Sequence, residues 1–377
     1  MLSGFMQWFA VSPPGLQGAV ARELGTLPGA VAEPPEPAGV AFSGDLTVGM
    51  AANLHLRTAT RVLLRLGEVK ARALPELERK LGDLSFAGLL PPVPADSIRV
   101  EVTTHRCRLY HTGAIAERLR NVLPKQANGA STPENEPRIL VRGIRDRFTV
   151  SLDSSGELLH RRGWRTEAGR APLRETLAAG ILTLCEHRPG STLIDGMCGA
   201  GTFAIEAAAM AQARAPGLGR HFAFESWPNF DAAAWKTLCD KARAQVVATR
   251  GVTICFDRNA DGIDRARRNA ERAGLGEALN FEVASFEDAL PPEGAPPGLV
   301  ILNPPYGRRL GSTQMARSVL TMIGERMRGP WQAYGLAILT PERDAEALLR
   351  MRSTEQFELD NGGLAVRLIR FAPQKQR

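Results

Sequence analysis

The sequence has few cysteines, and none of them is placed to work with another. The five cysteines are scattered through 377 residues, with no Cys-x-x-Cys pair and no histidine at metal-ligand spacing. This distribution argues against a disulfide framework and against a zinc site, and it is typical of a reducing compartment. We therefore expect a cytoplasmic protein that binds no metal.

The sequence also lacks the long apolar runs of a membrane protein. No stretch approaches the roughly 20 apolar residues that a membrane-spanning helix requires. The first residues, MLSGFMQWFAVSPPG, contain neither a basic leader segment nor a cleavage-site pattern. Because nothing in the sequence signals a subunit interface, we expect a monomer with no membrane partner.

Acidic residues are fewer than basic ones, which leaves a formal net charge of +7 and a pI near 9.5. Such an excess fits a polyanionic partner, although many basic proteins bind none. Two basic clusters have aromatic neighbours that could stack on unpaired RNA bases while the basic side chains face phosphates. They are Arg106, Arg108 and His111 in "HRCRLYH", and Arg161 and Arg162 in "HRRGWR". A solvated charged face would look the same, so both interpretations stay open.

Two N-terminal regions combine short strands with amphipathic helices. Residues 1–66 contain an extended start, a helix in "GLQGAVAREL", a strand in "GVAFSG" and a helical run that continues to Thr60. Residues 67–163 contain a strand around Val100, a helix in "TGAIAERLRNVL" and strands in "RILVRGI" and "RFTVSLD". Alternation of this kind in small regions predicts α+β layers.

Residues 164–377 have the pattern of an α/β domain. Apolar runs recur in "STLID", "VTICFD", "LVILNPP" and "GLAILT", with helical stretches between them. Runs this apolar are typical of parallel strands that helices cover on both faces, so we predict a Rossmann-like sheet. The tail "LAVRLIRFA" predicts a final antiparallel strand at the edge of that sheet.

A glycine-rich turn follows the first of these strands, in "LIDGMCGAGT". Asp195 ends the strand, and Gly196, Gly199 and Gly201 lead into a helix. Glycines let the backbone turn tightly and approach a ligand, and the helix N-terminus supplies free N–H groups. Cys198 in this turn has no base beside it, so we interpret it as a packing residue rather than a nucleophile.

An acidic residue, Asp257, ends the next strand. In doubly wound folds an acid at this point binds the ribose hydroxyls of a nucleotide. The turn lacks the GxGxxG order of dinucleotide sites, and Thr202 follows Gly201 where a phosphate-binding loop has lysine. This combination favours a nucleoside cofactor without phosphates, namely S-adenosylmethionine. A strand-end carboxylate that only caps the next helix remains the alternative for Asp257.

The strand in "LVILNPPYGRR" ends in residues suited to hold an exocyclic amino group of a nucleobase. The lone pair of such an amine is delocalised into the ring, and accepting hydrogen bonds from both of its hydrogens turns that lone pair toward a methyl donor. Asn303 offers a side-chain carbonyl, and Pro304 offers a backbone carbonyl whose direction the following proline restricts. Tyr306 can stack on the base, and Arg308 and Arg309 can hold the phosphates beside a flipped base. No general base is needed, so we predict catalysis mainly by positioning.

These motifs resemble those of class I methyltransferases that modify exocyclic amines. Over nearly the whole chain the sequence is similar to the bacterial THUMP-containing RNA guanine-N2 methyltransferases, and within that family to the amino-terminal half of the large-subunit ribosomal RNA enzyme. The similarity is carried by "DGMCGAGT" and "NPPYG", and by "FAVSPPGLQGAVARELG", "HRCRLYHTGAIAERL", "LHRRGWRTEAGRAPLRETLAAGIL" and "APGLGRHFAFESWPNFDAAAW".

The resemblance implies a ferredoxin-like segment at residues 1–66, a THUMP RNA-binding domain at 67–163 and a class I methyltransferase domain at 164–377. It implies an S-adenosylmethionine-dependent enzyme that methylates N2 of a guanine in RNA, with 23S ribosomal RNA as the first candidate. The cofactor residues that it implies are Asp195, Met197, Gly199 and Gly201 at the methionine end, Asp257 at the ribose, and Ser285 and Phe286 at the adenine.

Two positions depart from the family pattern. Gly196 stands where the family usually has proline, and Ser285 stands where relatives often carry aspartate, so the adenine amino contact passes to Ser285 Oγ, to backbone or to Asp288. Three other functions stay open: a transfer RNA guanine-N2 methyltransferase, a DNA adenine-N6 methyltransferase, and an RNA-binding protein that has lost activity. The last is disfavoured because Asp195, Asp257 and Asn303 are all present.

Overall fold

The computed structural model of the protein describes residues 5–91, 93–124, 136–166, 173–248, 251–305 and 313–374. The chain forms two compact units. The first contains residues 1–12, 20–159 and 219–241, and the second contains residues 13–19, 160–218 and 242–377. Three predicted site residues, Tyr306, Arg308 and Arg309, lie outside the described residues.

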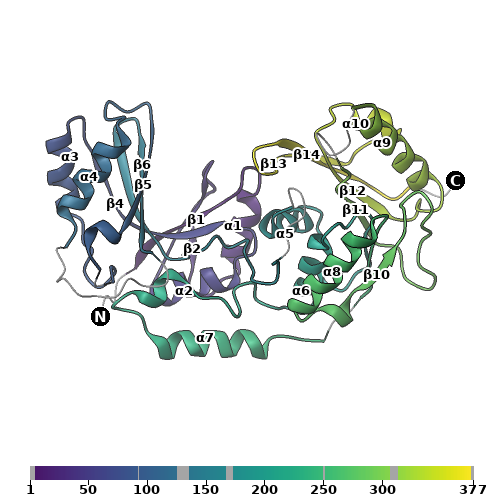
Figure 1. Ribbon diagram of the computed structural model, residues 1–377, viewed down its shortest axis with the longest axis horizontal. Coiled ribbons are helices and arrows are strands. Elements are labelled where there is room, and N and C mark those ends of the chain that lie inside the picture. The colour runs from purple at the N-terminus through teal and green to yellow at the C-terminus, as the bar shows by residue number, and fades with distance from the viewer. Residues whose placement is uncertain are drawn as a thin grey trace. The chain divides into compact units, whose positions relative to one another are not determined.

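The first unit is built on a seven-stranded sheet with the order β2-β3-β1-β4-β7-β6-β5 (Figure 1). β5 and β6 are parallel, and the other neighbours are antiparallel. Its strands are β1 (Met6–Val11), β2 (Val31–Ala32), β3 (Gly39–Gly44), β4 (Arg61–Lys70), β5 (Arg99–His105), β6 (Arg138–Ile144) and β7 (Arg147–Asp153). The boundary predicted between residues 66 and 67 falls inside β4, so one sheet joins both N-terminal regions.

The helices of this part of the chain follow the predicted amphipathic stretches, and one ends early. They are α1 (Gln17–Gly25), α2 (Leu46–His55), α3 (Leu74–Gly82) and α4 (Thr112–Val122). The helix predicted to continue to Thr60 ends at His55, because the next backbone N–H groups have another acceptor. The N–H groups of Arg57 and Thr58 donate to the carboxylate of Glu23 at 3.1 to 3.3 Å.

An aromatic segment from within the predicted catalytic span folds with the first unit. It covers residues 219–241 and includes the start of α7 (Ala232–Ala244). Phe222, Phe224 and Trp227 are buried in the core of the first unit, where Trp227 stacks on Trp8 with ring centroids 6.5 Å apart. The sequence did not predict that residues 219–241 fold with the first unit, because buried aromatic residues are equally typical of the core of either unit.

The second unit has a seven-stranded sheet with the order β10-β9-β8-β11-β12-β14-β13. The first five strands are parallel, which confirms the predicted Rossmann-like fold. β14 is antiparallel as predicted, but it lies between β12 and β13 and is therefore not the edge strand. The strands are β8 (Leu193–Asp195), β9 (Thr253–Asp257), β10 (Asn280–Val283), β11 (Leu299–Leu302), β12 (Gly335–Thr340), β13 (Glu355–Asp360) and β14 (Ala365–Phe371).

Both faces of the second sheet are buried, as the apolar strands predict. Ile301 and Ala337 pack with side chains of α5 (Glu175–Leu184) and α6 (Thr202–Ala211), while the neighbouring Val300 packs against α9 (Thr313–Arg328) in a separate core. Two further helices are α8 (Ala260–Arg272) and α10 (Ala345–Leu349). Among the helices of the described residues, none is long and apolar enough to span a bilayer.

The strand order places a ligand crevice at one edge of this sheet. The chain moves outward from β8 to β9 and β10 and then returns to the other side of β8 to form β11. Ligands of open α/β sheets bind beyond the carboxyl ends of the strands at such a reversal. The glycine-rich turn, Asp257 and Asn303 all follow strands that end at this edge.

Candidate functional site

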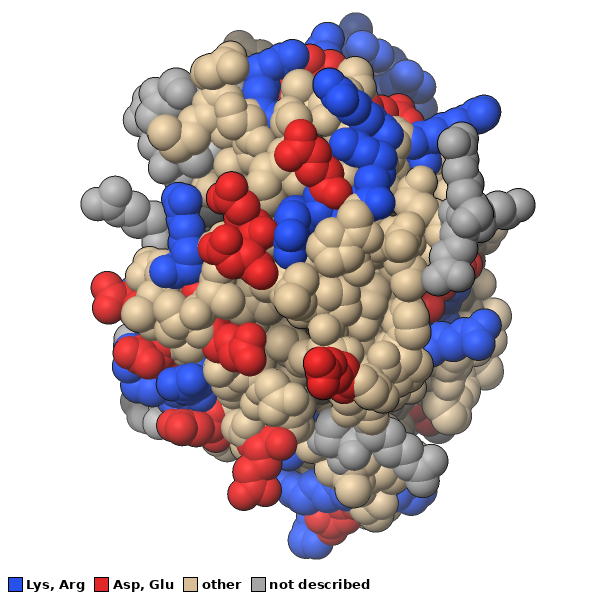
Figure 2. All heavy atoms as spheres, turned by 90° about the vertical axis from the view of Figure 1, so that its right-hand side faces the viewer, with Lys and Arg blue, Asp and Glu red and all other residues tan. Residues whose placement is uncertain are grey.

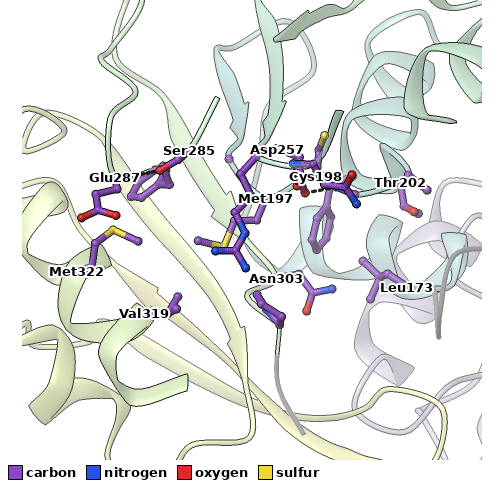
Figure 3. Close-up of a pocket in the computed structure, with 18 of the residues that line it drawn as sticks. Leu173, Met197, Cys198, Thr202, Asp257, Ser285, Glu287, Asn303, Val319 and Met322 are labelled. Atoms are coloured by element: carbon purple, nitrogen blue, oxygen red, sulfur yellow. Dashed lines mark hydrogen bonds between the residues drawn. The ribbon is translucent and has the colours of Figure 1, made fainter. Parts of the chain in front are cut away.

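A pocket of about 590 Å³ opens at the carboxyl edge of the second sheet. The turns that follow β8, β9, β10 and β11 line it, together with one face of α9. Figure 3 shows Ser285 and Glu287 near Val319 and Met322 at one end, Leu173 and Thr202 at the other end, and Asn303 between them.

The glycine-rich turn fits tightly against the core behind it. A Cβ atom on Gly196 would lie 2.8 Å from the Phe286 ring and 2.9 Å from Leu302. The Gly196 N–H also donates to the carbonyl of Ile301 at 3.4 Å, a bond that proline could not make. Gly201 has φ +78°, a left-handed conformation that favours glycine. The glycine at position 196 therefore has a packing reason of its own.

Asp257 holds the turn and the start of α8 in place. Its Oδ2 accepts from the Gly199 N–H at 3.0 Å, and its Oδ1 accepts from the Asn259 N–H at 2.9 Å. Asn259 in turn caps α8 by accepting from Asp261 N–H at 3.1 Å. Each carboxylate oxygen keeps a second lone pair, so the structural role that we kept as an alternative does not prevent Asp257 from also accepting from ribose hydroxyls.

Asp195 is buried, and neither carboxylate oxygen has a hydrogen-bond partner of good geometry among the described residues, although the backbone N–H of Ala204 is near enough to lower its pKa. Burial, together with the nearby charge of Asp257, raises the pKa of Asp195 to about 8. Asp195 is not among the residues that line the pocket, whereas Met197 and Gly199 of the same turn are. An orphaned buried carboxyl beside a ligand pocket is the kind of group that a ligand cation satisfies.

Cys198 is buried in the same turn, and its environment supports a packing role. Burial raises the pKa of the Cys198 thiol well above its ordinary value, and the same is true of Cys255 on β9. A thiol that stays protonated is a poor nucleophile. Neither residue is placed for covalent catalysis.

Asn303 follows β11 directly and lines the pocket. Its side-chain oxygen Oδ1 is buried and has no hydrogen-bond partner among the residues that the structure describes. A buried carbonyl oxygen without a donor costs about 1–3 kcal/mol, so a ligand N–H at this point would be stabilising. Pro304 is buried next to it. The structure thus brings Asn303, the glycine-rich turn and Asp257 to one pocket, as the sequence predicted.

At the end of the pocket assigned to adenine, Ser285 and Phe286 are less available to a ligand than the resemblance implied. Ser285 Oγ already accepts from the Glu287 N–H at 3.0 Å, so it holds its own loop. Phe286 stacks between Phe256 and Trp331, with ring centroids 6.1 Å and 5.6 Å away, and presents little surface to a ligand. Glu287 lines the pocket and Asp288 does not.

Several lining residues were missed from the sequence. Arg258 and Arg265 belong to the segment that begins α8, and Glu287 follows the predicted adenine pair. Val319 and Met322 lie three residues apart on α9. Their helical spacing was visible in the sequence, but it is equally typical of a buried face, and only the fold shows that this face lines a pocket.

Arg162, predicted to bind RNA, is turned into the second unit instead. Its side chain is buried, and its Nε lies 3.3 Å from Glu206 Oε1 on α6. Arg165 pairs in the same way with Glu175 at 3.1 Å and donates to Thr202 Oγ1 at 2.6 Å. A buried guanidinium that is paired with a buried carboxylate cannot reach an RNA phosphate. The prediction for Arg162 was therefore wrong.

The neighbours of Arg162 divide between core and surface. Trp164 is buried, and burial lowers the pKa of His160 to about 4, so this imidazole is neutral near pH 7. Arg161 is exposed. Of the basic residues in "HRRGWR", Arg161 remains a candidate for RNA contact.

The second predicted basic cluster lies on the first unit between β5 and α4. Arg106, Arg108 and His111 are all exposed there. Asp146 fixes this loop, because its Oδ1 accepts from the Arg108 N–H at 2.6 Å and its Oδ2 pairs with Arg72 Nε at 3.1 Å. These bonds lower the pKa of Asp146 and hold the cluster in a defined conformation.

On the one face drawn in Figure 2, charges of both signs are present. On the face shown in Figure 2, acidic and basic side chains alternate around an uncharged area. No group of three or more His, Cys, Asp or Glu side chains is arranged to hold a metal ion within the described ranges.

The sequence matches two protein families. Residues 162–369 match the family described as RMKL-like, methyltransferase domain, and residues 7–63 match the RlmL ferredoxin-like domain. The second match confirms the predicted ferredoxin-like segment.

Two relatives and one solved structure resemble the chain along its length. The protein named Ribosomal RNA large subunit methyltransferase K/L of Syntrophotalea carbinolica is 33% identical, over 99% of this chain and 54% of that protein, so this chain spans about half of its length. A Synechocystis protein provisionally named RNA methyltransferase slr0064 is 31% identical, over 97% of this chain and 96% of that protein. The crystal structure of SMU.472, provisionally described as a methyltransferase and complexed with SAH, has a TM-score of 0.88 and 28% identity, with 100% of both chains covered.

Proposed function

This chain belongs to the RMKL-like methyltransferase family, and from that premise we propose that it transfers the methyl group of S-adenosylmethionine to N2 of a guanine in RNA. Our first candidate substrate is 23S ribosomal RNA, which fits the name of the K/L relative. The observation that carries the proposal is the buried, unpartnered Oδ1 of Asn303 in the pocket.

The pocket suits S-adenosylmethionine. Asp257 ends β9, where doubly wound folds bind ribose, and among the described residues that line the pocket there is no lysine that would bind a nucleotide phosphate. The methionine end of the cofactor is proposed to lie on the glycine-rich turn that begins after Asp195, since Met197 and Gly199 of that turn line the pocket. The SAH bound to SMU.472, which matches this chain throughout, supports the same cofactor.

Asn303 and Pro304 would hold the amine that receives the methyl group. The amide oxygen of Asn303 and the backbone carbonyl of Pro304 accept the two amino hydrogens, which localises the nitrogen lone pair toward the methyl donor. The nitrogen then attacks the methyl carbon, the carbon–sulfur bond breaks, and the product loses a proton to water. Rate enhancement comes from alignment and from hydrogen bonds that strengthen as the nitrogen gains charge.

The RNA would contact exposed basic residues outside the pocket. Arg106, Arg108 and His111 form a fixed basic cluster on the first unit, and Tyr110 in the same loop is 65% exposed and stacks against His111. Guanidinium groups beside an exposed aromatic ring suit an RNA loop with unpaired bases. Arg308 and Arg309, which follow the Asn-Pro-Pro-Tyr segment, are proposed contacts for phosphates next to the target base, and Tyr306 is the proposed stacking partner.

The experiment that tests this function is identification of the methylated nucleoside. Ribosomal RNA, transfer RNA and DNA fractions from cells lacking the protein are incubated with the purified protein and isotope-labelled S-adenosylmethionine, digested, and analysed by mass spectrometry. We expect label in N2-methylguanosine from 23S ribosomal RNA. Label in transfer RNA would favour the second substrate, and label in N6-methyladenine of DNA would favour the third function. No label in any fraction would contradict the proposal of an active enzyme.

A further inference from the structure

Arg265 on α8 is a charged pocket residue without a partner. It lines the pocket, and its Nε atom is buried with no hydrogen-bond acceptor. No ion pair of its guanidinium is present among the described residues, although many arginines of the second unit are paired. The side chain as a whole is half-buried, so its buried Nε–H lacks an acceptor while the rest of the guanidinium can reach a ligand, and this combination suits an anion in the pocket.

The position of Arg265 is fixed by the packing of α8 on the glycine-rich turn. Gly262 leaves only 3.3 Å between a would-be Cβ and the carbonyl oxygen of Gly199, and Asn269 Nδ2 donates to the carbonyl of Ala200 at 3.1 Å. Arg265 lies between these two residues in the helix, three after Gly262 and four before Asn269. Its side chain therefore begins beside Gly199 and Ala200, at the turn rather than at the adenine end.

The helix that follows the turn adds positive potential at the same place. Gly201 is the N-cap of α6 and provides no side-chain acceptor, so the first N–H groups of the helix lack a side-chain cap. The hydroxyl of Thr202, the first residue of the helix, accepts from Arg165 at 2.6 Å. An uncapped helix N-terminus favours anions, and here an unpartnered guanidinium lines the same end of the pocket.

We propose that Arg265 binds the carboxylate of the amino-acid end of the cofactor. This inference rests on the proposed use of S-adenosylmethionine. The carboxylate is the one anionic group of that molecule, and Asp257, at the end of the strand that precedes α8, is the proposed contact for the ribose of the same ligand. Arg265 then orients the cofactor along the pocket by holding its carboxylate at the end beside the glycine-rich turn.

A small carboxylate fits this place better than a phosphodiester of the RNA. The Arg265 Nε atom is shielded from solvent inside a pocket, and a phosphodiester carries a nucleotide on each side that would have to enter with it. The terminal carboxylate of the cofactor has no such extension. The two anions make different predictions, because one belongs to the cofactor and the other to the RNA.

The test is a thermodynamic cycle in which the arginine is removed from the protein and the carboxylate from the ligand, first separately and then together. Binding of S-adenosylhomocysteine and of its decarboxylated analogue is measured by calorimetry on the full chain, for the parent and for Arg265→Met. We expect each single change to weaken binding about 10- to 100-fold. We expect the analogue to bind Arg265→Met no more weakly than S-adenosylhomocysteine does, since partners in direct contact give non-additive losses.

Controls separate the possible failures. Arg267→Met removes a charge two residues along the same helix, where the side chain donates to the Phe281 carbonyl and does not line this pocket, and it should leave both affinities unchanged. Two losses that simply add, or an unchanged affinity of Arg265→Met for S-adenosylhomocysteine with weaker binding of RNA, would overturn the assignment of Arg265. If the parent binds neither ligand, the proposed cofactor itself is wrong.

Discussion

Asp195 shows how the burial of one side chain sets the protonation of the site. Burial raises its pKa to about 8, whereas an aspartate in the unfolded chain titrates near 4. Between these values the folded protein holds a proton that the unfolded chain has released. The stability of the folded state therefore falls as the pH rises from about 4 to about 8, and it is level above that window.

Asp195→Asn should remove this dependence. Asparagine has a similar shape and does not ionise, so the variant should gain about 1.4 kcal/mol relative to the parent for each pH unit across the window. The measurement is the melting temperature of both proteins between pH 5 and pH 9 without ligand. Asp288→Asn, which removes an exposed carboxylate from the same unit, is the control and should follow the parent.

A melting-temperature difference between Asp195→Asn and the parent that stays constant with pH would show that Asp195 titrates as an ordinary aspartate. It would also remove the reason to expect that this carboxyl pairs with a cationic group of a ligand.

At the scale of elements, the segment from His160 to Thr166 ties two helices of the second unit together through its partly or fully buried arginines, Arg162 and Arg165. Two of its arginines form ion pairs with Glu175 on α5 and Glu206 on α6, and Arg165 also holds Thr202 at the start of α6. These bonds fix the helix that follows the glycine-rich turn. The geometry of the pocket therefore depends on residues that do not line it.

Arg162→Ala should destabilise the second unit by about 3–5 kcal/mol, because it leaves the carboxylate of Glu206 buried without this cation. The exposed neighbour Arg161 is the matched control, and Arg161→Ala should change stability by no more than about 0.5 kcal/mol. Chemical denaturation followed by a probe in the second unit measures both. Equal stability of the two variants would contradict the burial of Arg162.

Arg161 and Arg162 show why the sequence alone could not separate surface arginines from buried ones. "HRRGWR" places them side by side, and nothing local distinguishes a core residue from a surface one. The difference is made by Glu206, which lies 44 residues further along the chain. By contrast, Asp257 and Asn303 could be placed in one pocket from the sequence, because each follows an apolar run and parallel strands end at a common edge.

At the scale of the whole molecule, local motifs predicted more than the division of the chain did. Strand and helix patterns gave the Rossmann-like sheet, since its apolar strands and amphipathic helices are continuous in sequence. They did not reveal that residues 219–241 pack with the first unit, or that β4 joins the two N-terminal regions. Those features depend on contacts between segments that are distant in the sequence. The place of Arg265 in the pocket depends on such contacts as well, so the sequence did not predict it.

We expect RNA binding to depend on a few basic side chains in defined positions rather than on the net charge of the whole protein. Arg106→Ala and Arg108→Ala should each weaken RNA binding and lower the slope of log affinity against log salt by about 1, as expected for loss of one phosphate contact. Arg352→Ala removes the same charge from an exposed position of the second unit and is the control. Fluorescence anisotropy over a salt series measures the three slopes. Equal slopes for all variants would show that the cluster does not contact phosphate.

The most direct test of the account is the single-turnover rate of methyl transfer by Asn303→Ala. With saturating labelled S-adenosylmethionine and the RNA identified by nucleoside analysis, we predict a rate about 10²- to 10³-fold below the parent, with the affinity for S-adenosylhomocysteine unchanged. Asn280→Ala, an exposed amide on β10, should transfer at the parental rate. Transfer by Asn303→Ala as fast as by the parent would contradict the claim that this amide holds the amine for attack.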